Sequence, residues 1–255
     1  MKTMKKLTIP TAEPFFFPGG KTGCVLVHGF TGTPKEMRLM GNYLKENDIA
    51  VIGIRLAGHA TQISDMVRTR WRDWLVSVED GINLLSGSCD NIFVAGLSLG
   101  GILALMAASR YDIDGVIAIS TPYTLSDDWR AKFSKQISFF MPFVKKGQSD
   151  TVDQKTSKKH VDYPVYPMRS IAELYDLIET LHRSIDQIRI PVLLINSKKD
   201  KTASPIHAEK YSHKIHSNHF ELLTLKNSGH VITEDIEREF VFNSALNFIY
   251  KYSKQ

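Results

Sequence analysis

The chain has 255 residues and a mass of 28.8 kDa, a size at which one α/β domain can hold the whole sequence. With 43% hydrophobic and 23% charged residues, the composition supports a large core and argues against a disordered chain. Two cysteines are too few for a disulfide framework, and no apolar run reaches the ~20 residues that span a bilayer. We therefore expect one domain over 1–255, located in the cytoplasm.

The basic charge of the chain is local. Residues 1–6 are basic, as at the start of a signal peptide, but residues 7–14 add no apolar segment of the required length. The net charge is +5 and the pI about 9.0. The segment 122–170 alone contains nine Lys and Arg against five Asp, and so carries most of this excess. A regional excess argues against a protein-wide nucleic-acid surface, and we expect no nucleic-acid partner.

Short runs rich in valine and isoleucine alternate with amphipathic stretches, which predicts an α/β fold with a mostly parallel sheet. Several runs are apolar throughout, as in strands that are covered on both faces. The predicted strands are 23–27, 49–54, 91–95, 115–119, 190–195 and 219–225. The predicted helices are 34–46, 72–86, 99–110, 171–186, 204–215 and 236–250.

The segment 122–170 interrupts this alternation. It has no convincing strand, and loops of such length in a compact domain are usually functional lids or disordered. A helical stripe in it, which stops at Pro142, consists of Phe133, Ile137 and Phe140 or Met141. We predict that 122–170 is a small cap inserted over the active site; the alternative is a solvated surface excursion.

The strongest local signal is the run Gly96-Leu97-Ser98-Leu99-Gly100-Gly101, which follows the predicted strand 91–95 and opens the predicted helix 99–110. A serine at such a sharp strand-to-helix turn is held in strained geometry that exposes its Oγ above the sheet. Glycines two positions before and after it remove side chains that would collide. The helix N-terminus also stabilises developing negative charge. We predict that Ser98 is a nucleophile.

A second signal, His28-Gly29-Phe30-Thr31-Gly32, follows the predicted strand 23–27. The tetrahedral intermediate of acyl transfer carries an oxyanion that needs two preorganised N–H donors. At a G-x-S-x-G turn, one donor is the residue after the nucleophile and the other comes from a loop of this kind. We therefore predict the backbone N–H groups of Leu99 and Phe30 as donors. We expect His28 to fix the loop rather than to take part in catalysis.

The base should be a histidine that follows the acid in chain order. His230 lies in Ser228-Gly229-His230, just past the last predicted strand, and Asp200 is the single carboxylate in the loop after strand 190–195. We predict that Asp200 orients His230, which accepts the Ser98 proton. Four other histidines lie in or beside the predicted helix 204–215 and are expected to be solvated: His207, His213, His216 and His219.

The sequence contains no His-x-x-x-His, cysteine cluster or P-loop pattern, so we expect neither a metal nor a cofactor. The Gly58-His59 turn and the Trp71/Trp74 pair are expected to be structural.

Together, these motifs resemble the bacterial carboxylesterase and monoacylglycerol lipase branch of the α/β-hydrolase superfamily. The resemblance also includes 12–15, 65–66 and 73–74, but the segment 122–170 contains no matching motif. It implies an α/β-hydrolase fold with a small helical cap, a Ser, Asp, His triad and two backbone oxyanion donors. It also implies a small-molecule substrate, a short- to medium-chain ester or a monoacylglycerol.

Other functions remain open at this point. A serine at the turn argues against dehalogenases and epoxide hydrolases, which attack with a carboxylate, but thioesterases, peptidases and carbon–carbon bond hydrolases share the serine. A receptor built on a hydrolase scaffold is a further alternative. Weak contact of the segment 122–170 with anionic lipid is a hypothesis based on its lysines and on Phe133, Ile137, Phe139, Phe140, Phe143 and Val144.

Overall fold

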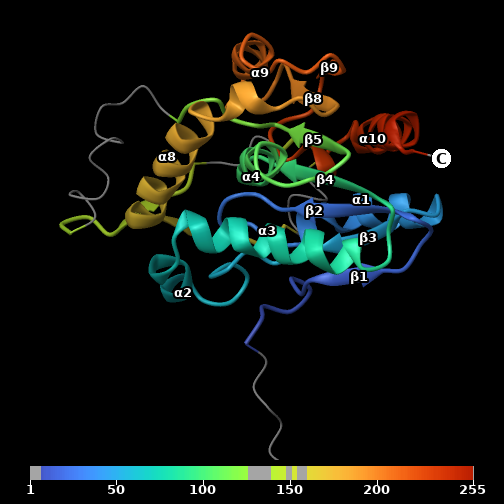
Figure 1. The fold of residues 1–255 in the computed structure, drawn as a ribbon. Coiled ribbons are helices and arrows are strands. Elements are labelled where there is room, and N and C mark those ends of the chain that lie inside the picture. The colour runs from blue at the N-terminus through green and yellow to red at the C-terminus, as the bar shows by residue number, and fades with distance from the viewer. Residues whose placement is uncertain (1–6, 126–138, 148–150, 154–159, 255) are drawn as a thin grey trace, which may run out of the picture.

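The computed structural model describes residues 7–125, 139–147, 151–153 and 160–254. Its centre is a seven-stranded sheet in the order β1-β3-β2-β4-β5-β8-β9 (Figure 1). β1 pairs antiparallel with β3, and every other neighbouring pair of this sheet is parallel. The strands are β1 Phe15–Phe17, β2 Thr22–Val27, β3 Ala50–Gly53, β4 Asn91–Leu97, β5 Gly115–Ile119, β8 Val192–Ser197 and β9 Phe220–Leu225.

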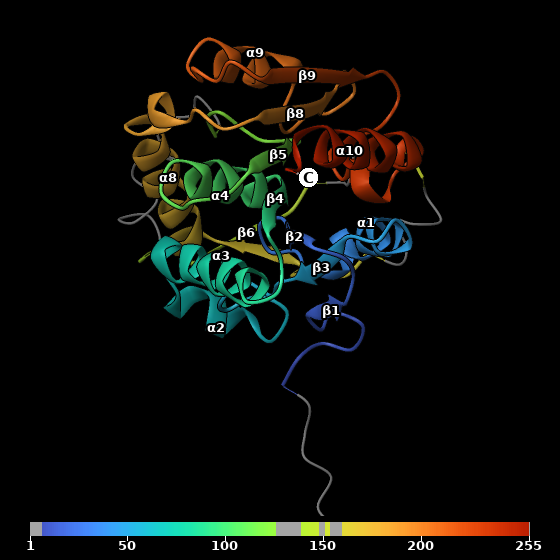
Figure 2. The same cartoon turned by 45° about the vertical axis from the view of Figure 1, so that its right-hand side comes forward.

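Helices cover both faces of the sheet (Figures 1 and 2). Apolar residues alternate along the strands between two buried clusters: one packs against α1 and α10, the other against α3, α4, α8 and α9. The helices are α1 Lys35–Glu46, α2 Ile63–Arg68, α3 Trp71–Ser86, α4 Leu99–Ala108, α8 Met168–His182, α9 Pro205–Ser212 and α10 Arg238–Tyr252. This three-layer arrangement is an α/β-hydrolase fold, as expected.

All six predicted strands and all six predicted helices are present, with ends that differ by a few residues. β1 and α2 were not predicted. β1 is only three residues long and lies at the sheet edge, where it follows Pro14. α2 has six residues, of which only Met66 is buried, too short a segment for a helical periodicity to show.

The expectation that 122–170 contains no strand is wrong. β6 Phe143–Lys145 and β7 Val165–Pro167 pair antiparallel as a separate two-stranded sheet. Each is three residues long and largely unburied, so neither has the apolar run by which strands were predicted. Phe133 and Ile137 of the predicted helical stripe lie outside the described residues. Among the helices described, none is both long and apolar enough to cross a bilayer.

Candidate active site

Ser98 occupies the sharp turn between β4 and α4. Its backbone has φ 56° and ψ −113°, a left-handed conformation that costs energy for any residue except glycine. The two flanking glycines make this turn sterically possible: a Cβ on Gly96 would lie 2.0 Å from the carbonyl oxygen of Gly100, and a Cβ on Gly100 would lie 2.1 Å from that of Val27. The turn therefore requires glycine on both sides of the serine.

Gly100→Ala is expected to destabilise the fold by about 1–3 kcal/mol, because the added methyl group overlaps backbone atoms that cannot move independently of β2. The measurement is the free energy of unfolding in urea. Gly87→Ala is the matched control, since its Cβ would have Leu84 O as its nearest atom, at 3.6 Å, and its φ is −69°. A stability for Gly100→Ala equal to that of Gly87→Ala would contradict the steric argument.

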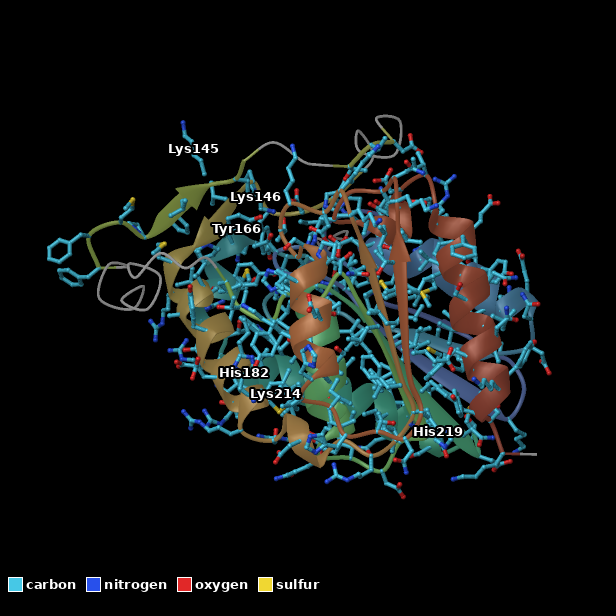
Figure 3. The ribbon with its side chains drawn as sticks, turned by 90° about the horizontal axis from the view of Figure 1, so that it is seen from above. Lys145, Lys146, Tyr166, His182, Lys214 and His219 are labelled. Carbon is cyan, nitrogen blue, oxygen red and sulfur yellow. The ribbon has the colours of Figure 1, made fainter. Side chains whose placement is uncertain are left out.

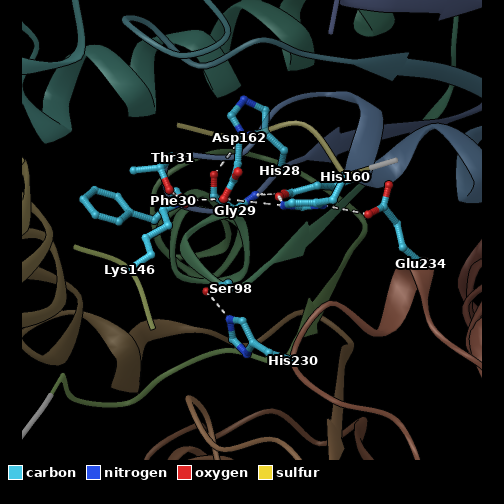
Figure 4. A network of polar contacts seen from close by, with 11 residues as sticks. His28, Gly29, Phe30, Thr31, Ser98, Lys146, His160, Asp162, His230 and Glu234 are labelled. Atoms are coloured by element: carbon cyan, nitrogen blue, oxygen red, sulfur yellow. Dashed lines mark hydrogen bonds and ion pairs between the residues drawn. The ribbon is translucent and has the colours of Figure 1, made fainter. Parts of the chain in front are cut away.

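The structure brings the three predicted side chains into one line of hydrogen bonds (Figure 4 shows Ser98 and His230). His230 Nε2 lies 2.9 Å from Ser98 Oγ, and His230 Nδ1 lies 2.8 Å from Asp200 Oδ2. These contacts join three loops at the carboxyl ends of β4, β8 and β9, and the two nearest of the three side chains, Asp200 and His230, are thirty residues apart in the sequence. With Nδ1 donating to Asp200, Nε2 is free to accept the serine proton.

Asp200 is held as an ionised acceptor. Its other oxygen, Oδ1, accepts hydrogen bonds from the N–H groups of Thr202 at 2.8 Å and Ala203 at 2.7 Å. Burial alone would raise the pKa of Asp200, but the hydrogen bond and charge of His230 and the two N–H donors hold it below its ordinary value. The carboxylate is therefore fixed in orientation before any substrate binds.

The predicted oxyanion donors belong to segments that adjoin Ser98. Leu99 is the first residue of α4, and Gly29 packs so closely that a Cβ on it would lie 3.7 Å from Ser98 Cβ. Neither the Phe30 N–H nor the Leu99 N–H has an acceptor among the described residues. Both donors are thus unpaired, as a site that waits for an oxyanion requires.

His28 is structural, as expected. It is fully buried, its Nε2 accepts the Leu56 N–H at 3.2 Å, and its Nδ1 donates to Gly29 O at 2.9 Å. Burial lowers the pKa of His28 well below its ordinary value, so that the ring is neutral. The expectation that His207 is solvated is wrong, because its Nδ1 accepts the Tyr123 N–H at 2.9 Å.

Aromatic side chains cover the oxyanion loop. Phe30 stacks on Tyr166 of β7, with ring centroids 5.8 Å apart, and meets Trp74 edge-on at 6.1 Å. Tyr163 fixes the same region, since its N–H donates to Thr31 O at 3.0 Å. In Figure 3, Tyr166 and Lys146 point toward the body of the molecule, whereas Lys145 points away from it. The segment 122–170 therefore contacts the site directly.

Sequence reasoning missed the carboxylates that hold the two active-site loops. Asp235 accepts the Gly229 N–H at 2.8 Å beside His230, and it also accepts the N–H groups of Val152 and Asp153. Glu36 accepts the Gly29 N–H at 2.7 Å beside Phe30. Both carboxylates lie in ordinary polar positions of the sequence, and no local pattern distinguishes them from solvated acids.

Glu36 belongs to a partly buried charged cluster, of which Figure 4 labels His160, Asp162, Lys146 and Glu234. His160 Nδ1 lies 2.8 Å from Glu234 Oε2, and its Nε2 lies 3.4 Å from Glu36 Oε1 and 3.8 Å from Asp162. Lys146 pairs with Asp162. Within the part of the chain that the structure describes, no group of three His, Cys, Asp or Glu side chains has an arrangement that could hold a metal ion.

The surroundings of this cluster raise the pKa values of two of its members. Burial raises the pKa of Glu36 to about 7. Burial would lower the pKa of His160, but Glu234, Glu36 and Asp162 outweigh it and raise that pKa to about 9. In both cases the folded state holds its proton to a higher pH than the unfolded chain does. The stability from these groups is therefore present at low pH and is lost as the pH rises through about 7 and 9.

We accordingly expect the free energy of unfolding to fall by about 1–3 kcal/mol between pH 6.5 and 9. Urea denaturation at both pH values measures this change. The double variant Glu36→Gln/His160→Gln, which removes both titrating groups, is expected to lose most of it, and His216→Gln, an exposed histidine, is the control. If the free energy of unfolding fell equally between the two pH values in the wild type and in the double variant, other groups would control the pH dependence.

The comparisons with known proteins show the family of this chain. A family model described as serine aminopeptidase, S33 (Hydrolase_4) matches residues 20–237, which include every residue of the candidate site. The chain belongs to this α/β-hydrolase family.

Relatives in the family cover nearly the whole chain. A thermostable monoacylglycerol lipase from Bacillus sp. (strain H-257) is 31% identical and covers 95% of this chain and 96% of its own length. A carboxylesterase from Bacillus subtilis (strain 168) is 28% identical over 96% of this chain and 99% of its own. A solved structure from a study of the metagenome-derived lipolytic enzymes LipS and LipT superposes with a TM-score of 0.89 at 28% identity. The match covers 96% of this chain and 99% of that structure's chain.

Proposed function

We propose that the protein hydrolyses carboxylic esters, with short- to medium-chain acyl esters or monoacylglycerols as substrates, through Ser98, His230 and Asp200. The family and its lipase and carboxylesterase relatives support the coarser statement, that the chain is a carboxylic ester hydrolase. The proposed mechanism through Ser98, His230 and Asp200 rests mainly on the 2.9 Å contact between Ser98 Oγ and His230 Nε2. This contact lies at a strained turn flanked by two unpaired N–H groups.

In the proposed mechanism, His230 Nε2 takes the Ser98 proton as Oγ attacks the ester carbonyl carbon. The N–H groups of Phe30 and Leu99 hold the resulting oxyanion. As the carbon–oxygen bond to the alcohol breaks, His230 donates its proton to the leaving oxygen. Water then attacks the acyl-enzyme, with His230 again taking and returning one proton, and releases the carboxylic acid.

The segment 122–170 acts in this proposal as an inserted cap over the site. Tyr166 stacks on Phe30, the backbone of Tyr163 binds Thr31, and the backbone of Val152 binds Asp235. These contacts support a cap that is seated on both active-site loops.

Hydrolysis of p-nitrophenyl esters from acetate to palmitate, with 1-monoacylglycerols in parallel, tests the proposed function. We expect turnover that peaks at short or medium chains, and strong monoacylglycerol turnover would identify a lipase. Absence of turnover on every ester by the folded protein would contradict the proposal. Labelling of Ser98 by a fluorophosphonate would then separate another serine hydrolase from a binding protein, which should not label.

A second candidate is peptidase activity, which the family description itself favours. Aminoacyl p-nitroanilides added to the same panel test it. Turnover of anilides above that of esters would replace the ester proposal.

Contact of the cap with anionic lipid remains a hypothesis. The side chains of Phe139 and Phe140 are 85% and 87% exposed, beside the exposed Lys145. We expect pelleting with anionic vesicles at low salt, weakened by Phe139→Ser/Phe140→Ser; no pelleting at low salt would refute the hypothesis. The cytoplasmic location likewise stays a prediction.

A further inference from the structure

Glu36 is a buried carboxylate outside the candidate triad. It lies in the first turn of α1, yet only 4% of the residue is exposed. Turned inward, it lies beneath the oxyanion loop, where a Cβ on Gly32 would lie 2.1 Å from its Oε1. A buried carboxylate is costly to fold unless hydrogen bonds and an opposite charge compensate it.

The first compensation is the hydrogen bond that Glu36 Oε2 accepts from the Gly29 N–H at 2.7 Å. Gly29 directly precedes Phe30, so the two N–H groups belong to neighbouring peptide units. With the Gly29 N–H tied to the carboxylate and Gly29 O bound by the Gly32 N–H at 3.1 Å, the peptide that carries the Phe30 N–H has little freedom to rotate. The carboxylate therefore helps to set the direction of the predicted oxyanion donor.

The second compensation comes from the cap. His160 Nε2 lies 3.4 Å from Glu36 Oε1, while His160 Nδ1 binds Glu234, four residues after His230. One cap side chain thus contacts both the carboxylate beneath the oxyanion loop and Glu234 behind the base; Figure 4 shows the contact with Glu234. The remaining charged groups around it are Asp162, which faces His160, and Lys146, which pairs with Asp162.

We propose that Glu36 is a positioning residue for the oxyanion hole, and that His160 holds its carboxylate in place, so that seating of the cap is coupled to the direction of the Phe30 N–H. This inference rests on the proposed function, because it takes Ser98 as the nucleophile. When the cap lifts, Glu36 loses its cation, and the Gly29 peptide loses the fixed acceptor that orients its neighbour. The oxyanion site is then complete only under a seated cap.

Glu36→Ala removes the acceptor and leaves the Gly29 N–H unsatisfied, so kcat is expected to fall by roughly 10- to 100-fold with little change in KM. Glu36→Gln keeps an oxygen for the Gly29 N–H but loses the attraction to His160, and is expected to lie between Glu36→Ala and the wild type. A kcat for Glu36→Gln as low as that of Glu36→Ala would contradict the positioning role, because glutamine keeps an oxygen acceptor for the Gly29 N–H.

The deciding readout is binding of a trifluoromethyl ketone, whose carbonyl forms a hemiketal oxyanion with the serine, against binding of an alcohol of equal chain length. For Glu36→Ala we expect the Kd of the ketone to rise about tenfold or more, while that of the alcohol stays within about twofold. Unchanged ketone binding, or an equal loss for both ligands, would overturn the inference. Calorimetry measures both Kd values and needs no turnover. The result therefore decides the inference even if the protein hydrolyses none of the esters tested for the proposed function.

A double-mutant cycle tests the coupling to the cap. His160→Gln is expected to lower kcat/KM about fivefold in the Glu36 protein but less than about twofold in Glu36→Gln. The control is Asp153→Asn, which removes a cap ion pair with Arg238 that lies away from the oxyanion loop. Additive effects of the Glu36 and His160 substitutions, or an Asp153→Asn loss as large as that of His160→Gln, would overturn the coupling. If Glu36→Ala does not fold, the cycle of Glu36→Gln and His160→Gln still tests the coupling.

Discussion

Replacing Ser98 by alanine is expected to lower kcat on any accepted ester by about 10⁵- to 10⁶-fold, with the fold unchanged. The proposed attack uses the Ser98 hydroxyl, which lies 2.9 Å from His230 Nε2, and alanine removes this nucleophile. The small methyl group fits the strained turn, so the thermal midpoint should stay close to that of the wild type. Initial rates with a p-nitrophenyl ester measure the loss.

The matched control is Ser109→Ala, at the opposite end of α4, where the hydroxyl donates to Met106 O. It should keep full activity and thereby exclude a general effect of substitution or handling. Turnover by Ser98→Ala above roughly one hundredth of the wild-type rate would mean that another group attacks the ester.

The sheet and the sharp turn at Ser98 could be predicted from the sequence because their signals are local. β4 is buried along its entire length, so its residues form the continuous apolar run of a doubly covered strand. Gly96 and Gly100 mark the turn for a reason that the structure makes plain, since a side chain at either would overlap backbone. Asp200 and His230 follow from the chain order that this kind of turn imposes.

The supporting carboxylates could not be predicted because their roles depend on contacts between distant segments. Glu36 lies in the first turn of a helix, where an acidic residue normally faces solvent and the helix dipole. Its burial depends on the oxyanion loop above it and on His160, 124 positions further along the chain. Likewise, β6 and β7 can be recognised as strands only from their pairing in the structure, since each alone is a three-residue stretch with little burial.

Asp200→Asn is expected to lower kcat by about 10⁴-fold, less than Ser98→Ala, because the nucleophile and both oxyanion donors remain. The structure specifies why asparagine fails. Asp200 Oδ1 accepts two backbone N–H groups, from Thr202 and Ala203, so the amide oxygen of asparagine must take that place. Its NH₂ group then faces His230 Nδ1 and donates a hydrogen bond to it. The ring proton of His230 therefore moves to Nε2. A protonated Nε2 can no longer accept the Ser98 proton.

This argument predicts more than a loss of rate. Fluorophosphonate labelling of Ser98 should slow in parallel with kcat, whereas the thermal midpoint should change little, because the asparagine keeps both backbone hydrogen bonds of the loop. Asp112→Asn, an exposed loop aspartate, is the control for the substitution itself. If Asp200→Asn hydrolysed esters at the wild-type rate, Asp200 would only order its own loop, and the orientation of His230 would have to come from another group.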